Sequence, residues 1–165
     1  MSFNDRSIWH IHGEVNVPNS ITLGYEHYAG YLQHLRAYLV TGTKSTYKNY
    51  QFVPIITRIG KNAIKFDSWV DFFFRKDIHI VGFTFDYIEM ELWWLLTYRA
   101  RCMYNKKCNI KNRIIYYYPQ QYGTEIRNKL QLLISNGVIP HSFAYSEDRK
   151  IDYYNRVFDR IEEGV

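Results

Sequence analysis

The stretch that decides the fold is IHIVGFTFDYIEMELWWLL, residues 78–96. Its apolar beginning, Ile78 to Phe83, predicts a strand, and that strand leads into a long helix from about Asp86 to Tyr104. Asp86 is suited to be the N-cap, with Glu89 placed close to a capping box. The side chains expected to form the buried stripe of this helix are Ile88, Leu92, Leu95, Leu96 and Met103.

Strands and helices continue to alternate downstream of this stretch. The predicted elements are a strand from Arg113 to Tyr118 stopped by Pro119, a helix marked by Ile126, Leu130 and Leu133 and ended by Gly137, a strand from Ile139 to Ala144, and a closing helix that packs Ile151, Tyr154, Phe158 and Ile161 on the sheet. This order predicts an α/β fold, a three-layer Rossmann-like sandwich with a mostly parallel sheet. The strands Ile78 to Phe83 and Arg113 to Tyr118 are expected to be central, because their continuous apolar runs suit coverage on both faces.

Upstream of residue 78 the pattern is less regular. The predicted elements are a strand from Ile8 to His12 ended by Gly13, a short strand from Ile21 to Leu23, a helix carrying Tyr28, Leu32, Leu35 and Leu39 on one face and ending near Gly42, and a short helix from Ser68 to Phe74 capped by Asp67 or Ser68. Residues 41–66 are polar at first and then mixed, so we expect an excursion from the sheet there. The whole chain, 1–165, is expected to be one domain.

Composition excludes several classes of protein. With 47% hydrophobic and 22% charged residues, the chain is neither disordered nor a low-complexity polymer. No apolar run is long enough for a membrane span and the N-terminus lacks a signal pattern, so a cytoplasmic location is expected. Cys102 and Cys108 match neither a zinc pair nor a disulfide framework, so we expect free thiols and no metal site.

The net charge of +5 raises the question of nucleic acid. The candidate basic side chains are Arg99, Arg101, Lys106, Lys107, Lys111 and Arg113. The basic residues are scattered, however, and an acidic C-terminal tail offsets them, so nucleic-acid binding rests on charge alone. We rank it last among the functions considered.

Two segments place polar or flexible residues after a predicted strand, where open parallel sheets form their ligand crevice. In the first, residues 10–13, alternation puts His10 and His12 on one face, and Gly13 allows a sharp turn. His12 could serve as a general base or could merely satisfy a backbone carbonyl at a strand end. Taken alone, the segment favours the second interpretation.

The second segment, residues 82–86, joins the strongest predicted strand to the predicted helix. Free N–H groups and the positive end of a helix dipole would make a phosphate seat there, with Gly82 allowing close approach and Thr84 supplying a hydroxyl. The sequence Gly82-Phe83-Thr84-Phe85 is not the dinucleotide fingerprint GxGxxG. An ordinary strand-to-helix turn with standard capping is an equally good interpretation.

Taken together and in order, these segments resemble the SIR2 (sirtuin) superfamily, especially its bacterial SIR2-like branch and the related AbiH-type phage-defence proteins. His12-Gly13 stands for the family's "HG", residues 23–26 loosely for its "GE" element, and residues 82–85 for its "GTSL" turn. The resemblance implies binding of NAD or an ADP-ribose-like ligand, with His12 as the base and Gly13, Gly82, Phe83 and Thr84 touching the cofactor. It also implies an NAD hydrolase of bacterial anti-phage defence.

The chain departs from the family in ways that weaken the case for catalysis. The Gly-rich first βα unit that holds the pyrophosphate in the family is absent, and so are the four zinc cysteines of true sirtuins. We therefore expect a C-terminal half that is incomplete alone and pairs with an N-terminal half or with itself. The alternative is a non-catalytic nucleotide-binding or protein-interaction domain, because unpaired sheet edges invite association.

Overall fold

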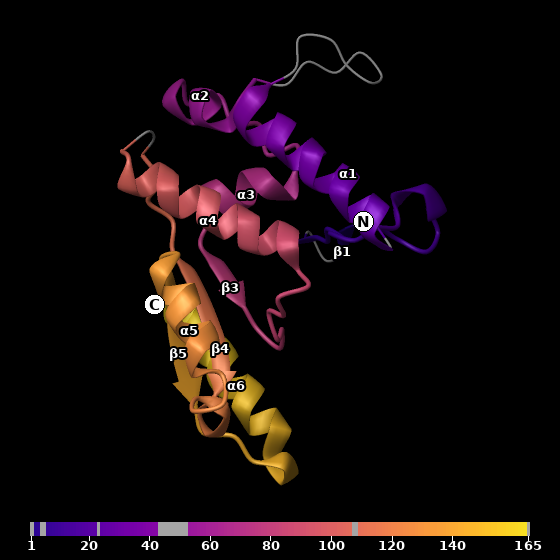
Figure 1. The fold of residues 1–165 in the computed structure, drawn as a ribbon. Coiled ribbons are helices and arrows are strands. Elements are labelled where there is room, and N and C mark those ends of the chain that lie inside the picture. Colours follow the sequence, from indigo (N-terminus) through magenta and orange to yellow (C-terminus); the bar gives the residue numbers. More distant parts are fainter. Residues whose placement is uncertain (1, 4–5, 23, 43–52, 107–108, 165) are drawn as a thin grey trace. The chain divides into compact units, whose positions relative to one another are not determined.

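The computed structural model describes the chain except for residues 1, 4–5, 23, 43–52, 107–108 and 165 (Figure 1). Contacts divide it into two compact units, Met1–Phe72 with Lys107–Asn109, and Phe73–Lys106 with Ile110–Val165. The expectation that the whole chain is one domain stays a prediction. Within the described part of the chain, no helix has the length and apolar character needed to cross a membrane.

The first unit is mainly helical. Its elements are the antiparallel pair β1 (Ser2–Phe3) and β2 (Arg6–Ser7), a 3-10 turn at Pro18–Ser20, α1 (Gly24–Arg36), a π-helical turn at Ala37–Thr41, α2 (Ile55–Gly60) and the beginning of α3 (Trp69–Arg75). Leu35 and Leu39 are buried, as the predicted helix face requires. The π-turn ends at Gly42, whose φ of 62° suits glycine, so the predicted end of this helix is confirmed.

A buried ion pair lies at the centre of the first unit. The Asp71 carboxylate is fully buried and accepts hydrogen bonds from the Tyr38 hydroxyl, at 2.9 Å to each oxygen, and from Arg58 Nη1 at 3.0 Å. The Arg58 guanidinium lies 4.3 Å from the centre of the Tyr38 ring. Burial and the hydrogen bond to Asp71 raise the pKa of Tyr38 to about 12, with Arg58 opposing them. These contacts connect α2 and α3 to the end of the α1 region.

The predicted strands of this region are wrong. Ile8–His12 contains no strand, because the chain turns at Ile11 and His12 and the turn is closed by a bond from Gly13 N–H to His10 O at 3.3 Å. Ile21 and Thr22 also lie outside any strand, and Leu23 lies outside the described residues. The predicted excursion over 41–66 contains α2, and its part at 43–52 lies outside the described residues.

The second unit is built on a parallel sheet in the order β3 (Ile78–Ile80), β4 (Ile114–Pro119), β5 (Val138–Phe143). Its helices are α4 (Met90–Tyr104), α5 (Arg127–Ser135) and α6 (Lys150–Glu162), with 3-10 turns at Gln120–Tyr122 and Glu147–Arg149 (Figure 1). Gly137 ends α5 with a φ of 76° and a bond from its N–H to Ile134 O, as predicted. The α/β class and the parallel pairing are thereby confirmed.

Both faces of this sheet are covered. On one face, Ile115 and Tyr117 of β4 form a buried cluster with Tyr153 and Val157 of α6. Since neighbouring side chains along a strand point to opposite faces, Ile114 lies on the other face, where it is also fully buried. β4 is therefore central as predicted, whereas β3 lies at an edge of the described sheet, so the prediction that it is central is wrong for the part described.

Two predicted boundaries of the second unit also need correction. β3 ends at Ile80 and α4 begins only at Met90, with Glu89 as its N-cap, so Asp86 does not cap the helix. A loop of nine residues, 81–89, separates the two elements. On α4, Leu92, Leu95 and Leu96 are buried as expected, but Met103 is exposed, and Ile88, which lies in the loop before the helix, is exposed too.

The face that α6 turns to the sheet also differs from the prediction. Tyr153 and Val157 are the buried residues, and Ile161 packs partly against them. Ile151, Tyr154 and Phe158 are 74%, 40% and 53% exposed. The apolar arc of this helix is wider than one sheet face can cover, and sequence spacing alone could not tell which half faces inward.

Candidate functional site

A pocket of about 440 Å³ lies where the parallel strands of the second unit end. Its lining residues are Gly82, Phe83, Thr84, Asp86, Tyr116, Tyr117, Tyr118, Pro119, Tyr122, Glu125, Ile126, Lys129, Tyr145, Tyr153 and Tyr154. They come from the loop after β3, the end of β4 and the turn that follows it, the start of α5, the segment after β5, and α6. This is the position at which open α/β sheets bind ligands, and the volume is within the range of small-molecule sites. We call it the tyrosine pocket.

The walls of the tyrosine pocket are aromatic rings that contact one another. The ring of Tyr145 packs edge-on against Tyr153 at 5.7 Å between centroids, and Tyr153 packs edge-on against Tyr154 at 5.2 Å. Tyr122 approaches Tyr145 from the turn after β4, at 6.4 Å. These geometries are typical of favourable aromatic pairs. The rings therefore hold one another in place and leave a preformed aromatic wall.

The phenols of the deeper rings stay neutral far above physiological pH. Burial raises the pKa of Tyr153 to about 12, with smaller contributions from the neighbouring Tyr154 and Tyr116. Burial likewise raises the pKa of Tyr116, and Asp86 and Tyr118 act in the same direction. The hydroxyls of Tyr153 and Tyr116 therefore add no charge to the pocket.

A lysine connects the loop after β3 to α5. Lys129 Nζ donates to Thr84 O at 2.9 Å and contacts Asp86 Oδ1 at 3.3 Å. The ammonium also lies 5.9 Å from the centre of the Tyr87 ring. Because Lys129 and Thr84 are 45 residues apart in sequence, this contact fixes one wall of the pocket against another.

Trp93 of α4 contacts the same loop at three residues. Its indole Nε1 donates to Asp86 O at 3.0 Å, and its ring stacks against Tyr87 and packs edge-on against Phe85. Phe85 is buried although its φ is 54°, a conformation that is strained for a bulky residue. Burial of this ring against Trp93 offsets the strain and sets the path of the loop.

The structure brings together three of the residues predicted to bind a cofactor, Gly82, Phe83 and Thr84, all of which line the tyrosine pocket. Gly82 has a φ of 65°, and a side chain added there would meet the Tyr154 hydroxyl at 3.5 Å. The predicted phosphate seat lacks its physical basis, however, because α4 begins six residues after Thr84 and its N-terminal N–H groups are not at these residues. Their contact with a cofactor stays a prediction.

His12 and Gly13, the other predicted site residues, belong to the first unit. The His12 ring packs edge-on against Tyr28 at 5.9 Å, and its carbonyl accepts a bond from Thr22 N–H at 2.9 Å. Gly13 has a φ of 97°, and a Cβ there would overlap the backbone of Ser20. Gly13 is thus required by the turn itself, while the shared crevice predicted for His12 and Thr84 stays a prediction.

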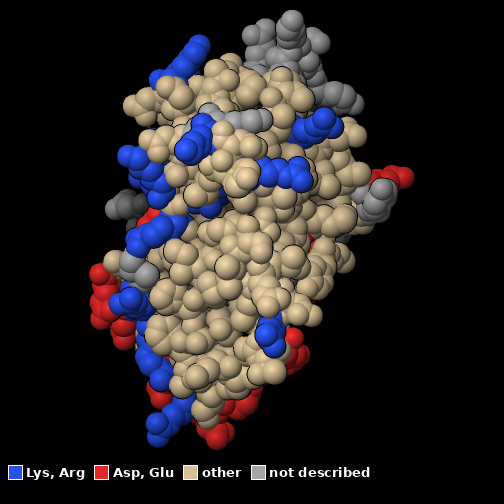
Figure 2. Space-filling view, turned by 60° about the vertical axis from the view of Figure 1, so that its left-hand side comes forward, with Lys and Arg blue, Asp and Glu red and all other residues tan. Residues whose placement is uncertain are grey.

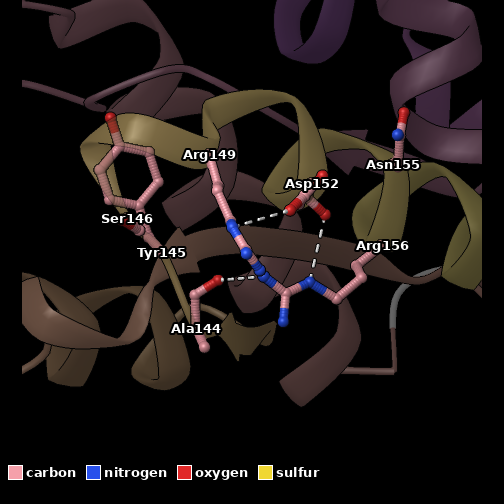
Figure 3. A pocket seen from close by; sticks show the side chains of 7 residues that line it. All are labelled: Ala144, Tyr145, Ser146, Arg149, Asp152, Asn155 and Arg156. Atoms are coloured by element: carbon pink, nitrogen blue, oxygen red, sulfur yellow. Dashed lines mark hydrogen bonds and ion pairs between the residues drawn. The ribbon is translucent and has the colours of Figure 1, made fainter.

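A second pocket, of about 540 Å³, lies beside the first and shares Tyr145 with it. Figure 3 shows its lining residues, among which both arginines are joined to Asp152 by dashed lines. Arg156 donates to Ala144 O at 2.8 Å and to Asp152 O at 3.1 Å, and Arg149 lies 4.0 Å from the Asp152 carboxylate. The Arg156 guanidinium is thus already engaged by protein oxygens, and Arg149 lies beside a carboxylate that offsets its charge, so this hollow is the weaker candidate.

Sequence reasoning missed most of the tyrosine pocket. The sequence analysis assigns no role in ligand binding to these tyrosines or to Lys129. The sequence does contain a signal for the pocket, because the run Tyr116-Tyr117-Tyr118 lies at the end of a predicted central strand. Large polar rings at that position are expected to border a crevice as well as a core.

Two of the basic candidates for nucleic-acid binding are engaged within the protein, whereas Arg101, Lys106 and Lys111 are exposed. Arg99 is buried and donates to the backbone and side chain of Asn112, and Arg113 pairs with Asp77 at 2.6 Å. Lys107 lies outside the described residues. In the lower part of Figure 2, Lys and Arg side chains are mixed with Asp and Glu.

The chain matches no protein-family model, no curated protein and no solved structure. Its function is therefore inferred from the chemistry of the pocket.

Proposed function

We propose that this chain is a SIR2-like, Rossmann-like nucleotide-binding module that takes the ring of the nicotinamide end of NAD in the tyrosine pocket. The observation that carries the proposal is the aromatic pocket at the ends of the parallel strands. Aromatic side chains stack on flat heterocycles, and each such contact contributes about 1–3 kcal/mol to binding of a nucleic-acid base. A cytoplasmic role in bacterial anti-phage defence belongs to the same proposal and rests on the sequence resemblance.

The residues of the pocket fit the nicotinamide end of NAD better than its diphosphate. The tyrosine rings suit a flat heterocycle, and their neutral hydroxyls suit a carboxamide or ribose. Among the described lining residues the only ammonium is that of Lys129, and it is already engaged by Thr84 O and Asp86, while Asp86 and Glu125 contribute carboxylates. We therefore assign the diphosphate of NAD no contact within the pocket.

Calorimetric titration tests the proposal. NAD should bind the purified chain, and ADP-ribose, which lacks the nicotinamide ring, should bind more weakly. Tyr122→Ala removes an exposed ring of the wall and should weaken NAD binding about five-fold, roughly 1 kcal/mol. The matched control is Tyr104→Ala, because Tyr104 is exposed on α4 and does not line the pocket. Equal affinities of both variants and the wild type for NAD would refute the site.

Hydrolysis of NAD, with His12 as the base, is the catalytic form of the proposal. The described residues that line the pocket include no arginine and no uncommitted lysine for a diphosphate, so positioning of the substrate by this chain alone should be poor. We expect release of nicotinamide by the purified chain to be near the uncatalysed level. Rapid release that is lost in His12→Ala would contradict that expectation and would make His12 catalytic.

Self-association is the second candidate function, and one observation favours it. Ile151, Tyr154 and Phe158 form an exposed apolar stripe on α6, bordered by charge. The charges at both ends of α6 are paired locally, Arg149 with Asp152, Lys150 with Glu147 and Arg160 with Glu163, so the apolar stripe is the feature that a second copy would cover.

Sedimentation velocity tests this second candidate. A dimer that dissociates in Phe158→Asp but persists in the exposed control Tyr104→Asp would support it. A monomer at all concentrations would refute it.

A further inference from the structure

A hydrogen bond connects the edge strand β3 to the wall of the tyrosine pocket. The Nδ1 atom of His79 lies 3.1 Å from the Tyr117 hydroxyl, and the two rings are stacked with 5.8 Å between their centroids and 14° between their planes. Tyr117 is buried and lines the pocket, whereas His79 is not among the described lining residues. His79 can therefore influence a ligand in the pocket through the tyrosine that it holds.

The acidities of the two groups set the direction of this hydrogen bond. A phenol is a better proton donor than a neutral imidazole N–H, and an imidazole nitrogen is a better acceptor than a phenol oxygen. We therefore assign the donated proton to the Tyr117 hydroxyl, which places the ring proton of neutral His79 on Nε2. In this direction the bond exists only while His79 is neutral, because both nitrogens of the protonated ring are donors.

The surroundings of His79 favour its neutral form. Burial lowers the pKa of His79 below its ordinary value of 6.5, Asp77 opposes this effect, and Arg113 adds to it. The Asp77 carboxylate is itself bound to Arg113 at 2.6 Å, so its charge is largely offset. Protonation is therefore disfavoured while the imidazole stays against Tyr117, and acid should favour a state in which the ring has moved into solvent.

Within the described part of the chain, no other side chain is hydrogen-bonded to the Tyr117 hydroxyl. Helix α6 packs Tyr153 against this ring, and the positive charge of Arg160 acts on it from the same helix. Strand β5 contributes the His141 ring, at 5.9 Å between centroids. When His79 leaves, the buried hydroxyl loses its acceptor, which is unfavourable for a buried polar group. We expect the Tyr117 ring to move in response, at a position where it forms part of the pocket wall.

We infer that His79 is a positioning residue of the tyrosine pocket, which holds the Tyr117 ring in the wall while it is neutral and releases it when it is protonated. The inference rests on the proposed function, because it names the control of ligand binding at that same pocket. Its grounds are the hydrogen bond, the stacked rings and the place of Tyr117 in the lining. The consequence is that the affinity for the ligand should fall in mildly acidic solution.

The release of Tyr117 can be measured without any ligand. In NMR titrations of the full chain between about pH 7.5 and about pH 5, the ¹⁵N shifts of His79 should show its proton on Nε2 at neutral pH. The ¹³C shifts of the Tyr117 ring should change with the same midpoint as those of His79. In Tyr117→Phe the hydroxyl is gone, so His79 should take up its proton at a higher pH than in the wild type. Tyr117 shifts that ignore the titration of His79 would overturn the inference, whatever the chain binds.

Calorimetric titration with NAD tests the effect on binding. The wild type should bind at least about three-fold more weakly at about pH 5 than at about pH 7.5, because the binding state requires a neutral His79. His79→Asn keeps an acceptor near the place of Nδ1 but cannot be protonated, so its affinity should be close to wild type at neutral pH and change little in acid. Tyr117→Phe should likewise lose the pH dependence. His141→Asn is the matched control and should keep it, because His141 packs on the same ring without a hydrogen bond to it.

The outcomes separate this inference from the proposed function. Binding of NAD with the same affinity at both pH values overturns the inference and leaves the binding site standing. A pH dependence that persists unchanged in His79→Asn and Tyr117→Phe overturns the inference as well, because it would arise from another group. Absence of NAD binding at both pH values overturns the proposed function and the inference together.

Discussion

Replacing Lys129 with Met tests how the wall of the tyrosine pocket is held. Methionine keeps the apolar stem and has a similar helix propensity, so α5 should be retained. The substitution removes the bond to Thr84 O and the contact with the Asp86 carboxylate. Both partners lie in the loop at 81–89. This loop belongs to no helix or strand, and it packs against Trp93.

The expected cost follows from the two contacts. A hydrogen bond from an ionised donor contributes about 1.5–3 kcal/mol, but the carbonyl that loses it belongs to an exposed residue and can bind water instead. The ion pair adds between 0 and about 1 kcal/mol because Asp86 is 61% exposed. We therefore expect a loss of about 1–2 kcal/mol, confined largely to opening of the loop.

Hydrogen exchange with mass spectrometry measures this opening. Amides of residues 82–88 should exchange roughly 5- to 30-fold faster in Lys129→Met, since 1.4 kcal/mol corresponds to about ten-fold. Lys111→Met serves as the control because Lys111 is exposed and does not line the pocket. Unchanged exchange at residues 82–88 would show that the ammonium does not hold the loop, and the reasoning from Lys129 would fail.

Three further predictions concern stability. Gly13→Ala should lower the thermal midpoint of unfolding markedly, because φ is 97° there and the new Cβ would overlap backbone atoms. Gly30→Ala is the control and should leave the midpoint unchanged, because a Cβ there meets nothing within 4 Å. Asp71→Asn should cost about 3–5 kcal/mol in denaturant unfolding, because it leaves the Arg58 cation, 16% exposed, without its carboxylate. The free energy of unfolding, followed by circular dichroism, should fall as the pH rises from 10 to 12. The Tyr153 phenol loses its proton near pH 10 in the unfolded chain, but in the folded protein its pKa is about 12. The expected loss of stability from this residue is about 2–3 kcal/mol.

Each of these three predictions has an outcome that contradicts it. Equal melting of the two glycine variants would show that the turn at residue 13 tolerates a side chain. An Asp71→Asn variant as stable as the wild type would mean that Arg58 finds solvent or another acceptor. Stability that stays constant to pH 12 would mean that the folded protein ionises its buried tyrosines as readily as the unfolded chain does.

The parts of the fold that sequence predicted correctly are those set by local signals. The apolar run of β4 before Pro119 and the glycine after α5 both fall where expected, because strand burial and a left-handed helix end depend on few neighbours. The α1 region likewise ends at Gly42.

The sequence-based predictions fail at positions where the structure is determined by contacts with residues elsewhere in the chain. Asp86 was expected to cap α4, but its carbonyl accepts the Trp93 indole and its carboxylate contacts Lys129, so the helix starts later. Ile151 and Phe158 have the spacing of a buried face, yet the neighbouring pair Tyr153 and Val157 packs on the sheet. In the pocket, only the residues after β3 were anticipated, because the others converge from four separate segments.

Solution NMR of the chain with ¹³C-labelled tyrosine rings, titrated with NAD, tests the central claim most directly. Single Tyr→Phe variants assign the resonances, and the chain supplies reference tyrosines outside the pocket, such as Tyr31 and Tyr104. The account predicts saturable shifts for the rings of Tyr122, Tyr145 and Tyr154 and none for the reference rings. Saturable binding of NAD that leaves all three pocket rings unshifted would contradict it.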